Sequence, residues 1–210
     1  MTLFTGKGDS GTTKVFNCDQ RISKSSNIAE ALGSLDEINS FLGLAKVQSA
    51  YLGYRLGDTL LSEIVHDLQK NLFVIQAELA GAEKTIPEKK VKWLEETINQ
   101  IEKELPPVKS FFISGGPSDP DKGQLSGAGL GAVFDIARAI ARRTERRVIA
   151  AAEEISQLQL PVSGPKENIK TAKISKYTKS YLNRLSSILY ALARYSNHLA
   201  GIAEEAPDYR

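Results

Sequence analysis

The stretch NIAEALGSLDEINSFLGLA, residues 27–45, decides the fold class of this 210-residue chain. Its apolar residues recur at steps of three and four, as in Leu35, Ile38 and Leu42. That period places them on one face of an α-helix. The stretch therefore predicts an amphipathic helix whose apolar face must be buried against another element.

The same periodicity returns along the chain over residues 61–79, 91–105, 133–155 and 182–202. Asp58 is the expected N-cap of the second helix, and Pro87 and the pair Pro106-Pro107 bound the third, because proline suits a first turn and stops a helix. The only short strand candidate is VKSFFIS, residues 108–114. Amphipathic helices that bury their apolar stripes against one another predict an all-α five-helix bundle.

One domain over residues 1–210 is expected, with a loop segment at residues 1–25 and the bundle at about residues 26–205. A hydrophobic content of 41% suits a single globular domain with a real core. Two polar, glycine- and proline-bearing stretches read as loops, namely SGGPSDPDKGQLSGAGLG at residues 114–131 and LPVSGPKENIKTAKISK at residues 160–176.

Composition excludes several classes of function. Lys and Arg (27) nearly balance Asp and Glu (25), so no overall charge recruits nucleic acid. Cys18 is the single cysteine, and His66 and His198 lie far apart, so neither a disulfide framework nor a zinc-ligand spacing is present. No apolar run is long enough to span a membrane and no targeting segment is evident. We expect a cytoplasmic protein without a bound metal of its own.

The stretch TGKGDSGTTK, residues 5–14, has the letters of a phosphate-binding loop. Gly6, Gly8 and Gly11 spell G-x-G-x-x-G, but a dinucleotide-binding loop follows a strand and opens a βαβ unit. Only MTLF precedes these glycines and helices follow. The dinucleotide interpretation is therefore disfavoured, and the residue order of a Walker loop is not met either.

Two interpretations of this stretch remain open. Glycines near a terminus are typical of a flexible tail. Hydroxyls and positive charges among the glycines instead favour a concave nest for a polyphosphate. The residues that supply them are Thr5, Ser10, Thr12, Thr13, Lys7 and Lys14, with Arg21 and Lys24 from the following RISK. Of the two interpretations, phosphate binding is favoured.

The predicted fourth helix carries a polar edge in ARAIARRTERRV, residues 137–148. Arg138, Arg142 and Glu145 are spaced i, i+4 and i+7 and so share one face at the rim of the core. Arg143 and Arg147 are expected to point to solvent. A solvated charged face or a basic helix for nucleic acid are the alternative interpretations, and the near-neutral total charge and Glu145 weaken the second. The first and fifth helices carry similar polar edges, as a shared site or a bundle interface would require.

Taken together, six motifs resemble the PduO-type ATP:cob(I)alamin adenosyltransferases over nearly the whole chain. They are TGKGDSGTT, RISK, ALGSLDEINSFLGLA, FFISGG, ARAIARRTERRV and YLNRLSSILYALARYSN, in the order found in that family. The resemblance implies a five-helix bundle that assembles as a homotrimer with active sites between subunits. It also implies transfer of the 5′-deoxyadenosyl group of ATP, brought with Mg²⁺, to Co(I) of a corrinoid such as cobalamin, with release of triphosphate.

The resemblance also implies roles for individual residues. The ATP-binding residues would be Thr5, Gly6, Lys7, Gly8, Asp9, Ser10, Gly11, Thr12, Thr13, Lys14, Arg21, Lys24, Arg142, Glu145 and Asn183. Asp36 and Arg138 resemble a pair that forms an intersubunit salt bridge beside the site. Phe111 matches the aromatic residue that closes the lower face of the corrinoid, with its neighbour Phe112 as the alternative. No D-x-H-x-x-G stretch is present, so no histidine ligand to cobalt is expected.

This sequence departs from the family pattern at Ser114, where proline commonly stands, and in a longer connection between the fourth and fifth helices. Neither departure touches the ATP motifs. A reductase and an adenosylcobalamin-dependent mutase are the protein partners that such an enzyme would have. The alternatives to this activity are a non-catalytic corrinoid carrier, another ATP-dependent transferase on a helical bundle, such as a phosphoryl transferase, and a basic helical nucleic-acid binder.

Overall fold

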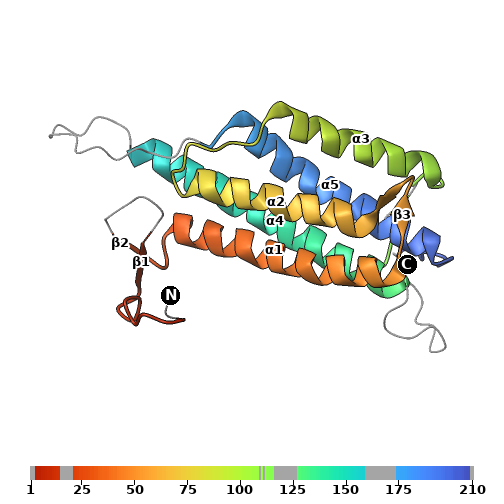
Figure 1. Cartoon of the computed structure of the whole chain (residues 1–210), viewed down its shortest axis with the longest axis horizontal. Helices are drawn as coiled ribbons and strands as arrows, with labels where there is room; N and C mark the ends of the chain where they lie inside the picture. Colours follow the sequence, from red (N-terminus) through yellow and green to blue (C-terminus); the bar gives the residue numbers. More distant parts are fainter. Residues whose placement is uncertain are drawn as a thin grey trace.

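The computed structural model describes residues 3–14, 21–108, 110, 112–115, 127–158 and 174–208. Five α-helices dominate this part of the chain and lie side by side along its long axis (Figure 1). They are α1 Asn27–Leu52, α2 Leu61–Leu79, α3 Glu88–Glu104, α4 Gly127–Leu158 and α5 Lys176–Leu199. α1 packs against α2 and α4, and α5 packs against α4 and α3. The predicted all-α five-helix bundle is confirmed.

The apolar stripes read from the sequence form the core. Leu35, Ile38 and Leu42 of α1 are fully buried, as are Leu182 and Leu185 of α5. Each fully buried leucine or isoleucine contributes about 1.5–3 kcal/mol relative to an exposed one. The fifth stripe ends sooner than predicted, because α5 stops at Leu199 and leaves that side chain 39% exposed.

Helix ends follow local chemistry. The Ser26 side chain caps α1 by accepting a hydrogen bond from the backbone N–H of Ala29 over 3.3 Å. The expected cap of α2 was wrong: Leu60 occupies that position, and its N–H donates to the Glu63 carboxylate over 3.0 Å. Asp58 instead lies in the tight turn before α2, between two short strands.

In the described part of the chain, four short strands form two hairpins. β1 Thr12–Lys14 pairs antiparallel with β2 Arg21–Ser23, and β3 Arg55–Leu56 pairs with β4 Thr59–Leu60. None of the described residues of the predicted strand 108–114 lies in a strand. Runs of two or three residues are too short for an alternating pattern to be recognised, so the sequence did not indicate these hairpins. The long loop predicted up to residue 131 also ends earlier, because α4 begins at Gly127.

A buried carboxylate fixes the start of α5. Glu78 of α2 is 3% exposed and accepts hydrogen bonds from the Ser175 N–H (2.6 Å) and the Thr178 hydroxyl (2.5 Å). A negative charge at a helix N-terminus satisfies free N–H groups and interacts favourably with the helix dipole. This contact sets the position of α5 relative to α2.

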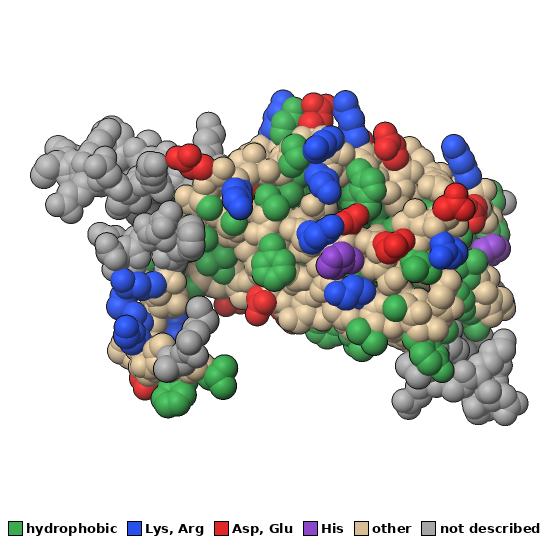
Figure 2. Space-filling model, in the orientation of Figure 1, with side chains coloured by type: hydrophobic (Ala, Val, Ile, Leu, Met, Phe, Trp, Pro, Cys, Tyr) green, Lys and Arg blue, Asp and Glu red, His purple; other side chains and the backbone are tan. Residues whose placement is uncertain are grey.

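Large apolar side chains stay exposed on α1, namely Leu44, Val47 and Tyr51, where the apolar surface along the lower edge of Figure 2 lies. Such a patch marks a site of association in many proteins. Among the described residues, no helix combines the length and the apolar character that crossing a membrane would require.

Candidate functional site

The N-terminal glycine-rich stretch forms an arm, residues 3–14 and 21–24, that extends beyond the start of α1 (Figure 1). Arg21 holds the arm together. Its guanidinium donates to the Thr12 hydroxyl over 2.7 Å, to the Thr12 carbonyl over 2.8 Å and to the Lys7 carbonyl. A planar fork with five donors is suited to such multiple contacts, so Arg21 organises the arm in this chain.

The spacing of the glycines follows from two turns. The N–H of Asp9 donates to the Gly6 carbonyl over 3.2 Å, and the N–H of Gly11 donates to the Gly8 carbonyl over 3.1 Å. Gly6 and Gly11 have φ of 65° and 76°, a region that favours glycine. The backbone N–H groups of Asp9 and Gly11 are therefore already bonded within the arm.

Positive charge is concentrated on the arm. Lys7, Lys14, Arg21 and Lys24 are all exposed, and Figure 2 shows Lys and Arg side chains gathered there. The Lys24 ammonium lies across Gly8, where an added Cβ would stand 3.0 Å from Nζ. The arm thus brings together four cations and several hydroxyls, as a polyphosphate ligand requires.

Three residues predicted to bind ATP come together on the bundle. Glu145 of α4 accepts a hydrogen bond from the Asn183 amide of α5 over 3.3 Å. Arg142, one turn before Glu145 on α4, is exposed, and its guanidinium has no hydrogen-bond or ionic partner in the described part of the chain. The Arg142 guanidinium can donate hydrogen bonds to a phosphate. The Asn183 amide and the Glu145 carboxylate, which orient each other, can form hydrogen bonds with other polar groups of a ligand.

The neighbouring Arg143 and Arg147 keep 42% and 37% of their side chains exposed, as expected, and each also has an acidic partner on α1. Arg143 donates to both carboxylate oxygens of Glu37, each over 2.5 Å. Arg147 forms an ion pair with Glu30. Both contacts join α4 to α1, so these two side chains fasten the helix whose other face carries Arg142 and Glu145.

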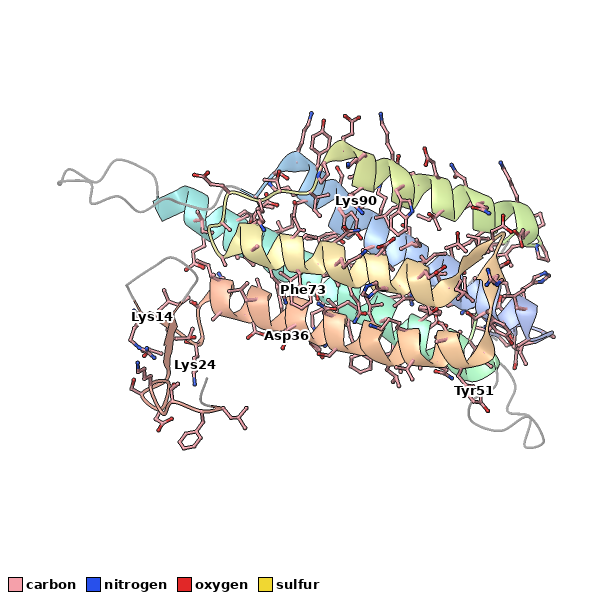
Figure 3. The ribbon with its side chains drawn as sticks, in the orientation of Figure 1. Lys14, Lys24, Asp36, Tyr51, Phe73 and Lys90 are labelled. Carbon is pink, nitrogen blue, oxygen red and sulfur yellow. The ribbon has the colours of Figure 1, made fainter. Side chains whose placement is uncertain are left out.

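Arg138 and Asp36 do not pair within this chain. The Arg138 Nε lies 3.7 Å from the Asp135 carboxylate, its guanidinium lies 5.9 Å from the centre of the Tyr190 ring, and the buried Nε makes no hydrogen bond. Asp36 is exposed on α1 (Figure 3). Within the described chain, Arg138 therefore contacts Asp135 and Tyr190 and not Asp36.

Of the two candidate aromatic caps, Phe111 lies outside the described residues. The ring of Phe112 is half-buried and lies 5.6 Å from the guanidinium carbon of Arg194. Arg194 also lies 5.1 Å from the centre of the Tyr190 ring. Burial raises the pKa of the Tyr190 phenol above its ordinary value, and the positive charge of Arg194 opposes that rise.

A group of buried charges here was not predicted. Arg194 donates to the Asp135 carboxylate over 2.6 Å and pairs with Glu204 over 2.8 Å. Arg194 lies on the fifth helix, for which the sequence predicted a polar edge but no partner. Neither Asp135 nor Glu204 lies in a recognisable motif. The only sequence signal for Asp135 was its i, i+3 spacing from Arg138 on the same helix.

The arm and the bundle residues remain separate in one chain. Lys14 and Lys24 lie on the arm beyond the end of the bundle, whereas Asp36 lies along α1 (Figure 3). The described part of the chain therefore holds the candidate residues as two separate halves, the arm and the α4–α5 edge.

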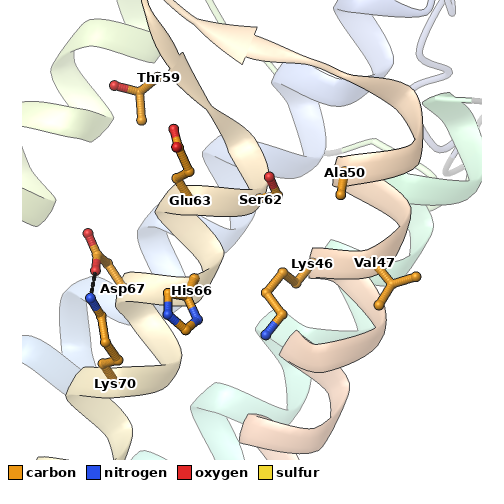
Figure 4. Close-up of a pocket in the computed structure, with 9 residues that line it drawn as sticks. All are labelled: Lys46, Val47, Ala50, Thr59, Ser62, Glu63, His66, Asp67 and Lys70. Atoms are coloured by element: carbon orange, nitrogen blue, oxygen red, sulfur yellow. Dashed lines mark ion pairs between the residues drawn. The ribbon is translucent and has the colours of Figure 1, made fainter.

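The surface groove of this chain lies away from the candidate ATP-binding residues. An open groove of about 700 Å³ lies between α1 and α2, where Lys46 points toward His66 (Figure 4). Its charges are mixed, and Lys70 is already paired with Asp67 over 2.5 Å. We place the site on the arm and the α4–α5 edge, because convergent polar groups decide a site better than volume does.

The fold and these residues define a five-helix-bundle protein with a cationic arm. The cobalamin adenosyltransferase family model matches residues 3–196, and the chain belongs to that family. It is 31% identical to the corrinoid adenosyltransferase of Bacillus subtilis over 209 residues, covering 97% of this chain and 91% of that protein. It is 32% identical to the corrinoid adenosyltransferase PduO of Salmonella typhimurium and 31% identical to that of Citrobacter freundii.

The matches to the two PduO proteins include 98% and 94% of this chain but only 53% and 50% of theirs, so the chain spans about half their length. Among solved structures, it resembles a variant of the PduO-type ATP:corrinoid adenosyltransferase from Lactobacillus reuteri complexed with cobalamin and ATP. That match has a TM-score of 0.75 and 25% identity, and it covers 98% of this chain and 99% of the other.

Proposed function

We propose that this chain is a corrinoid adenosyltransferase, which transfers the 5′-deoxyadenosyl group of ATP to Co(I) of cobalamin or a related corrinoid. The observation that carries the proposal is the group of Arg142, Glu145 and Asn183, which offers polar contacts to a nucleotide at one edge of the bundle. The names of the similar proteins and the ATP and cobalamin in the neighbouring structure support it.

The reaction asks little of the protein in covalent terms. Co(I) is itself a strong nucleophile: its electron pair forms the bond to C5′, the C5′–O bond breaks, and triphosphate leaves with the bonding pair as cobalt becomes Co(III). The protein must align the two substrates, exclude water and stabilise the charge of the leaving group. Lysines, arginines and polar backbone groups suit that task, and a nucleophilic side chain is not needed.

Within this mechanism, the arm is the triphosphate lid. Residues 5–14, with Arg21 and Lys24, would surround the phosphates of MgATP, and Arg142 would approach them from the bundle. Glu145 and Asn183 would fix the nucleoside through hydrogen bonds. Four exposed cations on one short arm match the charge that develops on triphosphate.

The separation of the two halves favours a homotrimer in which the arm of one subunit reaches the bundle of the next. The exposed apolar residues of α1 supply a surface for such contact. Asp36 of one subunit would then pair with Arg138 of its neighbour, beside the corrinoid. A reductase and an adenosylcobalamin-dependent mutase are the expected partners before and after the reaction, and cytoplasmic location remains part of the prediction.

An apolar cap on the lower face of the corrinoid would make reduction easier. In cob(II)alamin the axial base donates into the orbital that the incoming electron must occupy, so excluding the base favours Co(I). Phe111 is the first candidate for the cap. Phe112 is the second, because its ring already packs on Arg194.

One experiment separates this function from its rivals. Under anaerobic conditions, the chain is mixed with MgATP, cob(II)alamin and a strong reductant, and the cobalt spectrum is followed. We expect conversion to adenosylcobalamin. A phosphoryl transferase would release ADP, a carrier would bind corrinoid without turnover, and a nucleic-acid binder would show steeply salt-dependent binding to DNA or RNA instead.

A further inference from the structure

The C-terminal tail, residues 201–208, turns back along the bundle after α5. Gly201 has φ of 67°, and the N–H of Ile202 donates to the Asn197 carbonyl over 2.9 Å. A glycine in the left-handed region with such a bond is a common way to end a helix and redirect the chain. This tail lies beyond residues 3–196, which the family model matches.

Glu204 enters a buried cluster of charge on that return. Its carboxylate pairs with Arg194 over 2.8 Å and accepts a hydrogen bond from the Asn197 amide over 2.7 Å. The Arg194 side chain is 2% exposed and pairs on its other side with Asp135, whose side chain is 5% exposed. The buried Asp135 and the partly buried Glu204, 16% exposed, share one buried guanidinium, so the loss of either would leave the Arg194 charge without full compensation.

Asn197 belongs to this cluster because α4 and α5 pack closely at Gly131. A Cβ added at Gly131 of α4 would stand 2.1 Å from the Asn197 Oδ1 and 3.1 Å from the Ala193 carbonyl. A larger residue at this position would displace the Asn197 side chain and crowd the Ala193 carbonyl. Asn197 is 1% exposed, and its amide is therefore fixed in the direction of Glu204.

The tail in turn holds the segment at residues 112–115. The N–H of Ile113 donates to the Glu205 carbonyl over 2.8 Å, next to the residue that Arg194 binds. Phe112 adds its ring contact with Arg194. One arginine therefore contacts the segment directly and holds the tail that binds its backbone.

We propose that Glu204 is a positioning residue, whose pairing with Arg194 fixes the tail against residues 112–115 and so sets the position of the aromatic segment for the corrinoid. Glu204 touches neither substrate in this scheme and acts through Arg194 and the Ile113 backbone. The second half of the inference rests on the proposed adenosyltransferase function. The first half, the bracing of the segment, does not.

The test compares Glu204→Gln with Glu205→Gln. Glu205 is the ideal control, because its side chain is exposed and it serves the segment only through its backbone carbonyl. Residue-resolved hydrogen exchange of the Ile113 amide, measured without ATP or corrinoid, reports how firmly the tail holds residues 112–115. We expect about tenfold faster exchange in Glu204→Gln and parent exchange in Glu205→Gln. Arg194→Lys, which keeps the charge but loses the fork, should resemble Glu204→Gln.

The second readout is the fraction of bound cob(II)alamin in the four-coordinate state with ATP present. It should fall in Glu204→Gln while ATP affinity stays at the parent value, and Glu204→Asp should recover part of it. Parent exchange at Ile113 in both Glu204→Gln and Arg194→Lys would overturn the inference. Faster exchange with an unchanged four-coordinate fraction would overturn its functional half. If the parent itself makes no adenosylcobalamin, the proposed function fails while the exchange result still decides the brace.

Discussion

The Asn183 amide on α5 donates to the Glu145 carboxylate on α4 across 3.3 Å, one helical turn from Arg142, whose guanidinium has no partner among the described residues. Residues 38 positions apart in the chain thus form one polar group at the helix–helix edge. The contact orients the Asn183 side chain, whose Oδ1 also accepts from Arg184 over 3.0 Å.

Asn183→Ala should weaken ATP binding without affecting corrinoid binding, because it removes an amide from the polar group with Glu145 and leaves residues 112–115 unchanged. The loss of one or two hydrogen bonds corresponds to about 1–3 kcal/mol, or roughly 5- to 150-fold in the dissociation constant for MgATP. Titration calorimetry measures it. Asn99→Ala, the same change at an exposed position of α3, should bind ATP like the parent. Equal ATP affinity in both variants would remove Asn183 from the site.

Arg21→Lys should loosen the arm and reduce ATP affinity, since a single ammonium cannot reproduce the contacts to Lys7 and Thr12. Hydrogen exchange over residues 5–14, with and without MgATP, follows this directly. In the parent we expect strong protection on adding MgATP, and in Arg21→Lys a smaller gain. Arg55→Lys is the control, because Arg55 also donates to a hairpin carbonyl, that of Asp58, but in the other hairpin. If MgATP does not change the hydrogen exchange of residues 5–14 in the parent protein, the proposal that the arm closes over the triphosphate is wrong.

Asp36→Asn should weaken both assembly and turnover if Asp36 pairs with Arg138 across subunits. Leaving one charge of a buried pair uncompensated costs about 3–5 kcal/mol. Sedimentation at several protein concentrations reports assembly, and Arg138→Lys should not restore a forked contact. The neighbouring Glu37→Gln loses only the in-chain pair with Arg143 and should keep the parent assembly. Parent-like assembly and rate in both Asp36→Asn and Arg138→Lys would refute the pair.

Glu78→Gln should destabilise the bundle by about 1.5–3 kcal/mol, the usual contribution of hydrogen bonds to a charged group. The carboxylate caps the start of α5 from α2, and glutamine keeps the shape while losing the charge. Urea unfolding at a fixed protein concentration gives the free energy. Glu96→Gln, at an exposed position of α3, should leave it unchanged. If the two variants unfold alike, the cap contributes nothing.

The sequence predicted the helices well because burial imposes a 3.6-residue period on every stripe. Its spacing rule also placed Arg138 and Glu145 on one face of α4. The short hairpins were missed because two or three residues show no period. Asp58 was assigned as a cap because its side chain suits one, although the tight turn of the β3–β4 hairpin places it before the helix.

Other parts of the site depend on contacts that no local pattern records. Glu78 precedes the buried Leu79 in the sequence and has no feature that distinguishes it from a solvent-exposed glutamate. It is buried only because α5 packs against it. Glu204 follows the last predicted stripe in a tail without periodicity, and its partner Arg194 belongs to another element. Similarly, the partners of Arg143 and Arg147 lie on α1, so the sequence pattern of α4 alone could not predict them. Pairing across elements is decided by packing, which one sequence does not display.

The most direct test is to identify the phosphate product together with the corrinoid product. Purified chain, MgATP and chemically reduced cob(I)alamin are incubated without oxygen, and both products are quantified by chromatography. We predict one triphosphate for each adenosylcobalamin formed, with no ADP, because attack at C5′ breaks the bond to the whole triphosphate. Release of ADP, or consumption of ATP without formation of a cobalt–carbon bond, would contradict adenosyl transfer.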